Sequence, residues 1–164
     1  MEFQKEIEEI NPEKIVYVDE AGMDNDDVLQ YGWAPKGERL YQLKPGNVTQ
    51  RTSMIGAWNN GDFIAPLIFE GYTNGDVFMT YLKKVLIPVL IPGQIVIMDN
   101  AAFHKGSAIR DLIESVGCFL KYLPTYSPDL NPIEHCWYPL KNSFRKNLIK
   151  YDYDLFQAAQ FAFN

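Results

Sequence analysis

Three acidic residues stand where carboxylates can do metal-dependent chemistry. Asp19 follows the apolar run 15–18, and Asp99 follows a second apolar run at 95–98. If these runs are neighbouring parallel strands, both side chains emerge at the carboxyl edge of the sheet, where open α/β sheets bind ligands. Two carboxylates placed so closely repel each other, and a divalent cation such as Mg²⁺ or Mn²⁺ removes that repulsion. Each Asp could instead cap the turn that follows its strand.

Glu134 is the third candidate, and it has two interpretations. Asn131 and Glu134 have the spacing of a capping box, with Pro132 at the first helical position, so the carboxylate could bond back to the backbone at the start of a helix. Alternatively, the same carboxylate completes a metal site with the two aspartates. Spacing alone does not separate these readings.

The elements that would position the acids alternate along the chain. Apolar runs predict strands at 15–18, 95–98 and 119–123, and a hairpin of 51–58 with 63–69 around an Asn-Gly-Asp turn. Apolar periodicity predicts helices from Asn74 to about 86, from a cap at Ser107 to 116, over 133–148, and from about 154 onward. A hairpin followed by alternating helix and strand is typical of a mixed α/β sheet with helices on both faces.

Two prolines should disturb these elements. Pro66 lies inside the second hairpin run and predicts an edge or bulged strand. Pro139 falls five residues after Glu134 and predicts a kink or an interruption of the last long helix. A kink there would move Glu134 relative to the two aspartates.

Length and composition fit one folded domain. The 164 residues are 47% hydrophobic and 22% charged, so we expect a peripheral charged segment at 1–12 and a single domain at 13–164. No apolar run is long enough to span a bilayer, and the acidic start does not resemble a secretory signal. Cys118 and Cys136 fit neither a disulfide framework nor a zinc site, which favours a reducing, cytoplasmic location.

The charge distribution is unusual for a protein that binds nucleic acid. The formal net charge is −6, and residues 1–30 contain ten acids and two lysines, against thirteen basic and eleven acidic residues in 31–164. Nucleic-acid binders usually carry net positive charge. Binding of this kind would therefore depend on a particular site rather than on bulk charge.

Three segments of the chain resemble the catalytic domain of the IS630/Tc1/mariner transposases, most closely the bacterial IS630 type. They are VDEAG at 18–22, MDNAAFHK at 98–105 and YSPDLNPIEHCW at 126–137. The 34 residues between Asp99 and Glu134 fit the D…D-34-E arrangement of that family. Trp33, Pro35 and Gly37 also resemble its W-x-P-x-G stretch. The resemblance extends from about residue 13 to about residue 150.

This resemblance implies a ribonuclease H-like fold and a cut-and-paste DNA transposase. Asp19, Asp99 and Glu134 would be the catalytic triad and would hold two Mg²⁺ ions, for which Mn²⁺ can substitute. We expect Asp99 to contact both ions, Asp19 to bridge them and Glu134 to hold one. The partners implied are transposon ends and a TA target, with a dimer in the working complex.

Five further residues are candidates for contacts with DNA, because such contacts position the duplex through its phosphates. They are Asn100, His104, Lys105, Lys141 and Arg145. The basic residues could equally form an ordinary solvated helix face, and a lone histidine is more often structural. Tyr126 and Trp137 could stack on a base, although core packing is the commoner role. Glu20 should point away from the metals, because adjacent strand residues face opposite sides.

One expected part of such a transposase is missing. A helix-turn-helix region that reads the element ends has no place before Asp19, so we expect it on a separate polypeptide or lost, and we expect weak DNA binding by this chain. Two other functions remain open. One is a host nuclease of the ribonuclease H or resolvase kind, and the other is an inactive, transposon-derived binding module.

Overall fold

The fold is built on a five-stranded mixed sheet with the order β3-β2-β1-β4-β5. The central strand β1 (Ile15–Asp24) pairs antiparallel with β2 (Arg51–Asn59) and parallel with β4 (Ile95–Met98). The edge strands are β3 (Asp62–Glu70), antiparallel to β2, and β5 (Phe119–Tyr122), parallel to β4. The mixed sheet expected from the sequence is therefore confirmed.

The computed structural model describes residues 2–24, 51–150 and 155–162. Trp33, Pro35 and Gly37, which carried part of the family resemblance, lie outside the described residues. Within the described ranges, every helix is too short or too polar to cross a membrane.

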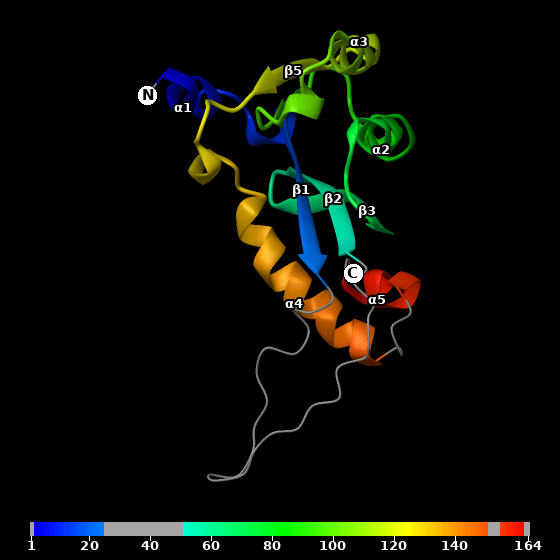
Figure 1. The fold of residues 1–164 in the computed structure, drawn as a ribbon. Coiled ribbons are helices and arrows are strands. Elements are labelled where there is room, and N and C mark those ends of the chain that lie inside the picture. The colour runs from blue at the N-terminus through cyan, green and yellow to red at the C-terminus, as the bar shows by residue number, and fades with distance from the viewer. Residues whose placement is uncertain (1, 25–50, 151–154, 163–164) are drawn as a thin grey trace.

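The larger core lies on one face of the sheet. Successive residues of β1 face opposite sides, so Val16 and Val18 point into this core, which they share with α2 (Gly75–Tyr81) and α3 (Ser107–Ser115). Figure 1 shows both helices on the same side of β1. This core fixes the strands that carry the two aspartates.

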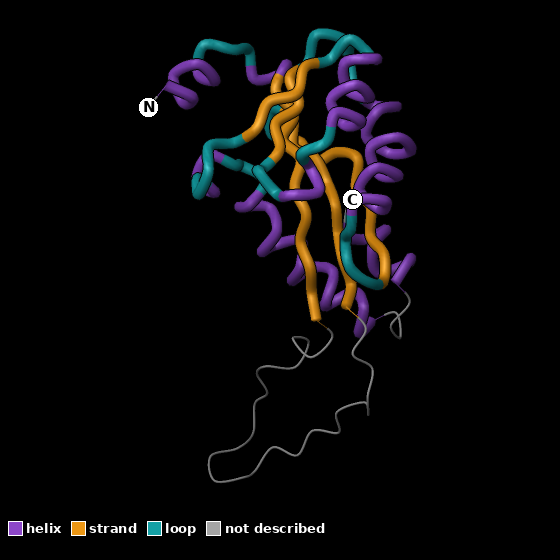
Figure 2. Tube along the Cα trace, turned by 45° about the horizontal axis from the view of Figure 1, so that its top comes forward, coloured by secondary structure: helices purple, strands orange, loops and turns teal. Residues whose placement is uncertain are grey.

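The other face of the sheet is covered by three helices. α4 (Glu134–Lys150) and α5 (Leu155–Ala162) pack there in a second core, and α1 (Glu2–Glu8) contributes to a third, smaller one around Tyr17. Figure 2 shows the strands as one layer with helices on either side, as predicted. The short α1 was not predicted from the sequence, because most of its residues are charged or polar and only Phe3 and Ile7 are apolar residues that pack.

The hairpin forms where the turn signal predicts it. Asn60 and Gly61 both have positive φ, 46° and 99°, which is the conformation that a two-residue hairpin turn of type I′ requires. β3 is an edge strand, and its register shifts opposite Ile55 and Ala57, next to Pro66. The edge and bulge predicted from Pro66 are thus confirmed.

The helix starts agree only in part with the predictions. Asn74 caps α2, because its side-chain oxygen accepts the Val77 N–H at 3.0 Å. Ser107, however, is not a cap: Gly106 occupies the cap position of α3 without a side-chain bond. Ser107 is therefore the first residue inside the helix, and the prediction was wrong by one position.

Pro139 does not interrupt the long helix. α4 runs from Glu134 to Lys150 with Pro139 inside it, so the predicted interruption is wrong. The proline lies near the start of the helix, where its missing N–H removes one backbone hydrogen bond rather than ending the element. Glu134 therefore sits in the first turn of a helix that packs along the sheet.

Candidate active site

The sheet register brings the two aspartates to the same level. The parallel pairing of β1 with β4 ends at Tyr17 opposite Ile97. Asp19 and Asp99 each follow two residues later, so both lie just beyond the point where the strands separate. β1 itself continues past Asp19 because β2 still pairs with it, which corrects the prediction that this strand ends there.

All three acids line one cleft. Asp19, Asp99 and Glu134 face a cavity of about 320 Å³. Its remaining wall comes from Asn100 and from the segment between β5 and α4, namely Leu123, Pro124, Thr125, Tyr126, Ser127, Pro128 and Asn131. Residues that are far apart in the sequence therefore share one space at the carboxyl edge of β1 and β4, as predicted from the strand pattern.

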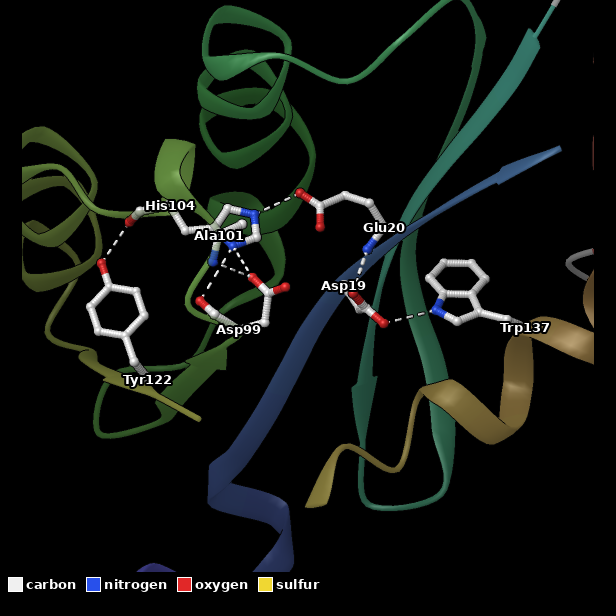
Figure 3. Close-up of polar contacts among 7 residues, drawn as sticks. All are labelled: Asp19, Glu20, Asp99, Ala101, His104, Tyr122 and Trp137. Carbon is white, nitrogen blue, oxygen red and sulfur yellow. Dashed lines mark hydrogen bonds and ion pairs between the residues drawn. The ribbon is translucent and has the colours of Figure 1, made fainter. Parts of the chain in front are cut away.

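Asp19 is buried and held by two donors. Its Oδ1 accepts the backbone N–H of Glu20 at 2.8 Å, and its Oδ2 accepts the indole N–H of Trp137 at 3.0 Å (Figure 3). Burial raises the pKa of Asp19 to about 7, the Trp137 bond opposes that rise, and the nearby charge of Glu134 adds to it. Asp19 is thus part-protonated near neutral pH.

Asp99 is held by its own loop. Its Oδ1 accepts the Ala101 N–H at 2.9 Å and lies 2.5 Å from Nδ1 of His104. The His104 bond is the main reason why the pKa of Asp99 falls below its usual value. Asn100 donates from Nδ2 to the Leu123 carbonyl at 2.6 Å, so it ties the loop after β4 to the end of β5.

Glu134 does not form a capping box. The Asn131 N–H, which Glu134 would have to bind, donates instead to the Pro128 carbonyl at 2.8 Å. The Asn131 side-chain oxygen is buried without a hydrogen-bond partner in the part of the chain that the structure describes. The capping interpretation is therefore wrong, and the exposed Glu134 carboxylate is available to the cleft.

The cleft fits a hard divalent cation by its chemistry. Carboxylate and amide oxygens are the ligands that Mg²⁺ prefers, and Asn131, whose buried side-chain oxygen has no partner among the described residues, is one of the residues that line the same space. A cation would also offset the burial of Asp19 and its repulsion from Glu134. In the described residues, however, no three acidic, His or Cys side chains converge closely enough to hold an ion as they stand. An ion held by all three acids would therefore need at least one of them, such as the exposed Glu134, to lie closer to the others.

The structure reassigns His104. Its side chain is fully buried, and Nε2 lies 2.6 Å from Glu20 Oε1 while Nδ1 contacts Asp99. Both ring nitrogens face protein carboxylates, which favours the structural role that is commoner for a lone histidine, and contact with a DNA phosphate stays an untested prediction. The pKa of His104 is raised to about 9: burial works against the charged ring, but the bonds to Asp99 and Glu20 more than offset it.

The basic candidates lie outside the cleft. Among the residues that the structure describes, none that lines it is Lys or Arg. Lys105 is exposed just after His104, whereas Lys141 and Arg145 are half-buried on α4, with Arg145 donating to Asn142 at 3.4 Å. The structure does not test their contacts with DNA, and these stay predictions.

The two aromatic candidates differ. Trp137 is 5% exposed and packs in the second core, as expected, but it also holds Asp19. Tyr126 is 98% exposed at the rim of the cleft with φ at 58°, so the expectation of core packing is wrong for it.

Two residues of the site were missed. Strand alternation correctly placed Glu20 on the opposite face from Asp19, but it gave no sign that His104 lies there. The helical periodicity of 133–148 marked Trp137 as core, but it did not reveal the indole N–H bond. A buried donor needs a partner, and this was the signal available.

The comparisons agree with this geometry. The family model described as DDE superfamily endonuclease matches residues 14–155. A pre-cleavage Mos1 transpososome matches with a TM-score of 0.61 at 18% identity, over 98% of this chain and 54% of that one. The HTLV-2 integrase catalytic core domain in complex with magnesium matches with a TM-score of 0.58 at 14% identity, over 94% and 85%. No curated protein sequence gives a significant match.

The fold and the site thus define a ribonuclease H-like domain. Its acidic cleft lies at the carboxyl end of the parallel pair β1 and β4. The chain belongs to the DDE superfamily endonucleases. It spans about half the length of the Mos1 chains that it resembles.

Proposed function

We propose that this chain is the catalytic domain of a cut-and-paste DNA transposase in which Asp19, Asp99 and Glu134 form the triad. The observation that carries the proposal is the shared cleft, which collects three acids from β1, the end of β4 and the start of α4. Membership of the DDE endonucleases supports it, as do the Mos1 complexes among the structural neighbours. The narrower IS630 type rests on the sequence motifs alone.

The metal would be Mg²⁺ or Mn²⁺, held by the three carboxylates. Several neighbours are Mos1 structures with Mg or Mn, which supports the use of divalent ions. When bound, two such ions supply an activated nucleophile and neutralise the leaving oxygen of a phosphodiester. Asp19, Asp99 and Glu134 would hold these ions together, with the largest share expected for Asp99.

The protein contributes position and charge. The donors from Trp137 and Glu20 hold one lone pair on each oxygen of Asp19, so the carboxylate is oriented before any cation arrives. Asn100 fixes the loop that carries Asp99. No covalent protein intermediate is needed, because water or a 3′-hydroxyl is the attacking group.

The remaining partners are proposals of the same kind. DNA ends, a TA target and a dimer in the working complex follow from the resemblance, and the Mos1 paired-end complexes support the DNA partner and the dimer. Contacts of Asn100, His104, Lys105, Lys141 and Arg145 with DNA stay predictions from the sequence. The helix-turn-helix region that reads the transposon ends would lie on a separate polypeptide or be lost, as expected from the sequence.

One assay tests the proposal against its alternatives. The chain is incubated with Mn²⁺ and supercoiled plasmid, transposon-end DNA or an RNA–DNA hybrid, with Asp99→Asn as the matched control. Nicking or strand transfer by the wild type and none by the mutant is the expected result. Cleavage confined to the hybrid would instead favour a ribonuclease H, and inactivity on every substrate would favour the inactive binding module.

We expect weak binding of random duplex by this chain alone. Its net charge is −6 and the described lining of the cleft contains no Lys or Arg, so few phosphates are neutralised. Fluorescence anisotropy at physiological salt should give a dissociation constant of about 10 μM or weaker, within or beyond the usual range for non-specific binding. A nanomolar complex would contradict this.

A further inference from the structure

Glu20 and His104 form a buried bridge to the metal-facing aspartate. His104 lies between the two acids, with Nε2 2.6 Å from Glu20 Oε1 and Nδ1 2.5 Å from Asp99 Oδ1 (Figure 3). Both neighbours of the ring are hydrogen-bond acceptors when ionised, so both ring nitrogens donate. Glu20 therefore fixes the ring from one side, and the ring fixes Asp99 from the other.

The ring of His104 is also held by its surroundings. Phe78 packs on it with ring centroids 4.3 Å apart, and the Tyr122 hydroxyl donates to the His104 carbonyl at 2.6 Å. The side chain is 0% exposed. The imidazole thus has little freedom to rotate, and its direction is passed on to the carboxylate that it binds.

The bridge occupies only one oxygen of Asp99. Oδ1 accepts from both His104 and Ala101, whereas Oδ2 has no protein partner within the ranges that the structure describes. The Asp99 side chain is about half exposed and lines the cleft. The bonds to Oδ1 therefore present Oδ2 to the space that it shares with Asp19 and Glu134.

We propose that Glu20 is a positioning residue that acts through His104 to aim the Asp99 carboxylate at the divalent cation. The inference rests on the proposed function for the cation, but the bridge itself exists without it. Partners of this kind orient metal ligands, and their loss typically lowers metal affinity by about 10- to 100-fold.

Two substitutions at Glu20 separate contact from charge. Glu20→Gln keeps the length and the acceptor oxygen but removes the charge. Glu20→Asp keeps the charge but is one methylene too short to reach Nε2. Positioning predicts that the Gln variant binds Mn²⁺ nearly as the wild type does, and that the Asp variant binds about 10- to 100-fold more weakly. The free Mn²⁺ signal in electron paramagnetic resonance measures this, with the exposed Glu70→Gln as the control.

A second readout uses the metal-free protein. In ¹⁵N-edited NMR, both ring N–H groups of His104 should be protected from solvent in the wild type and in Glu20→Gln, and the Nε2 proton should lose its protection in Glu20→Asp. If the Asp variant keeps that protection and the wild-type affinity, or if the Gln variant is the weaker of the two, the inference is overturned. If no variant binds Mn²⁺, the proposed function fails, and the NMR result still decides whether Glu20 holds the ring.

Discussion

Asp19→Asn should make the metal-free protein more stable at pH 8 while removing its cleavage activity. Burial raises the pKa of Asp19 from an ordinary value of 3.8 to about 7, so the folded protein resists losing this proton. The contribution of this carboxyl group to the free energy of unfolding is fully present below pH 3.8, the ordinary pKa, and is lost as the pH rises through the folded-state pKa of about 7. Three pKa units correspond to about 4 kcal/mol, an upper bound because Asn replaces one accepted bond imperfectly.

The stability difference between mutant and wild type should therefore grow with pH. Urea unfolding at several pH values should give free energies of unfolding for mutant and wild type that nearly coincide at pH 4. Above pH 7 they should differ by a few kcal/mol. Mg²⁺ should narrow the gap by stabilising only the wild type. Asp129→Asn, an exposed acid before α4, is the matched control and should leave the curve unchanged. A gap that does not change with pH would contradict the buried-charge explanation.

The same substitution should lower plasmid nicking by about a thousandfold or more. Metal ions supply several kcal/mol of charge stabilisation in reactions at phosphorus, and each 1.36 kcal/mol is a factor of ten in rate. A substitution that raises the stability of a protein and lowers its activity is typical of a functional residue in an unfavourable environment. Lower stability of the mutant at pH 8 would place Asp19 among the structural residues instead.

Trp137→Ala should be the most destabilising change near the cleft. The indole is almost fully buried and donates a hydrogen bond to Asp19. It also packs edge-on against Phe63, with the two ring centroids 5.6 Å apart. Removing a buried aromatic ring costs about 3–5 kcal/mol, and here it also removes the hydrogen bond that joins α4 to Asp19 of β1. Chemical denaturation measures the loss. Tyr138→Ala, at the exposed neighbouring position, should change the free energy of unfolding by at most about 0.5 kcal/mol.

Trp137→Phe isolates the hydrogen bond. Most of the ring volume remains, but the donor that opposes the rise of the Asp19 pKa is gone. The pKa of Asp19 should therefore move above its value of about 7, as seen by ¹³C NMR titration of the labelled carboxyl group. An unchanged or lower pKa would mean that the indole does not stabilise the ionised form.

Much of the fold could be predicted because local signals agreed with it. The β-branched runs ending near Asp19 and Asp99 predicted buried strands, and the Asn-Gly turn predicted the hairpin. The common level of the two aspartates followed from the same pattern, because each stands directly after an apolar run and the two runs pair in parallel, Tyr17 opposite Ile97. These features depend on short stretches of sequence and on strand geometry, so one sequence was enough.

The failures concern contacts between distant segments. Whether Glu134 caps its helix depends on Pro128, whose carbonyl takes the N–H that a capping box would need. The burial of His104 depends on Phe78 and Glu20, which belong to other elements. No periodicity encodes such pairings. The interruption predicted at Pro139 was wrong for a different reason. The packing of α4 on the sheet offsets the cost of a proline near the start of the helix.

The most direct test of the shared metal site is iron-mediated cleavage of the protein itself. Fe²⁺ bound in place of Mg²⁺ generates radicals with ascorbate that cut the backbone beside its ligands, and mass spectrometry locates the cuts. The account predicts cuts next to Asp19, Asp99 and Glu134 together, suppressed by excess Mg²⁺ and absent in Asp99→Asn. Cuts at only one or two of these positions, or cuts that Mg²⁺ does not suppress, would contradict a single site built from all three acids.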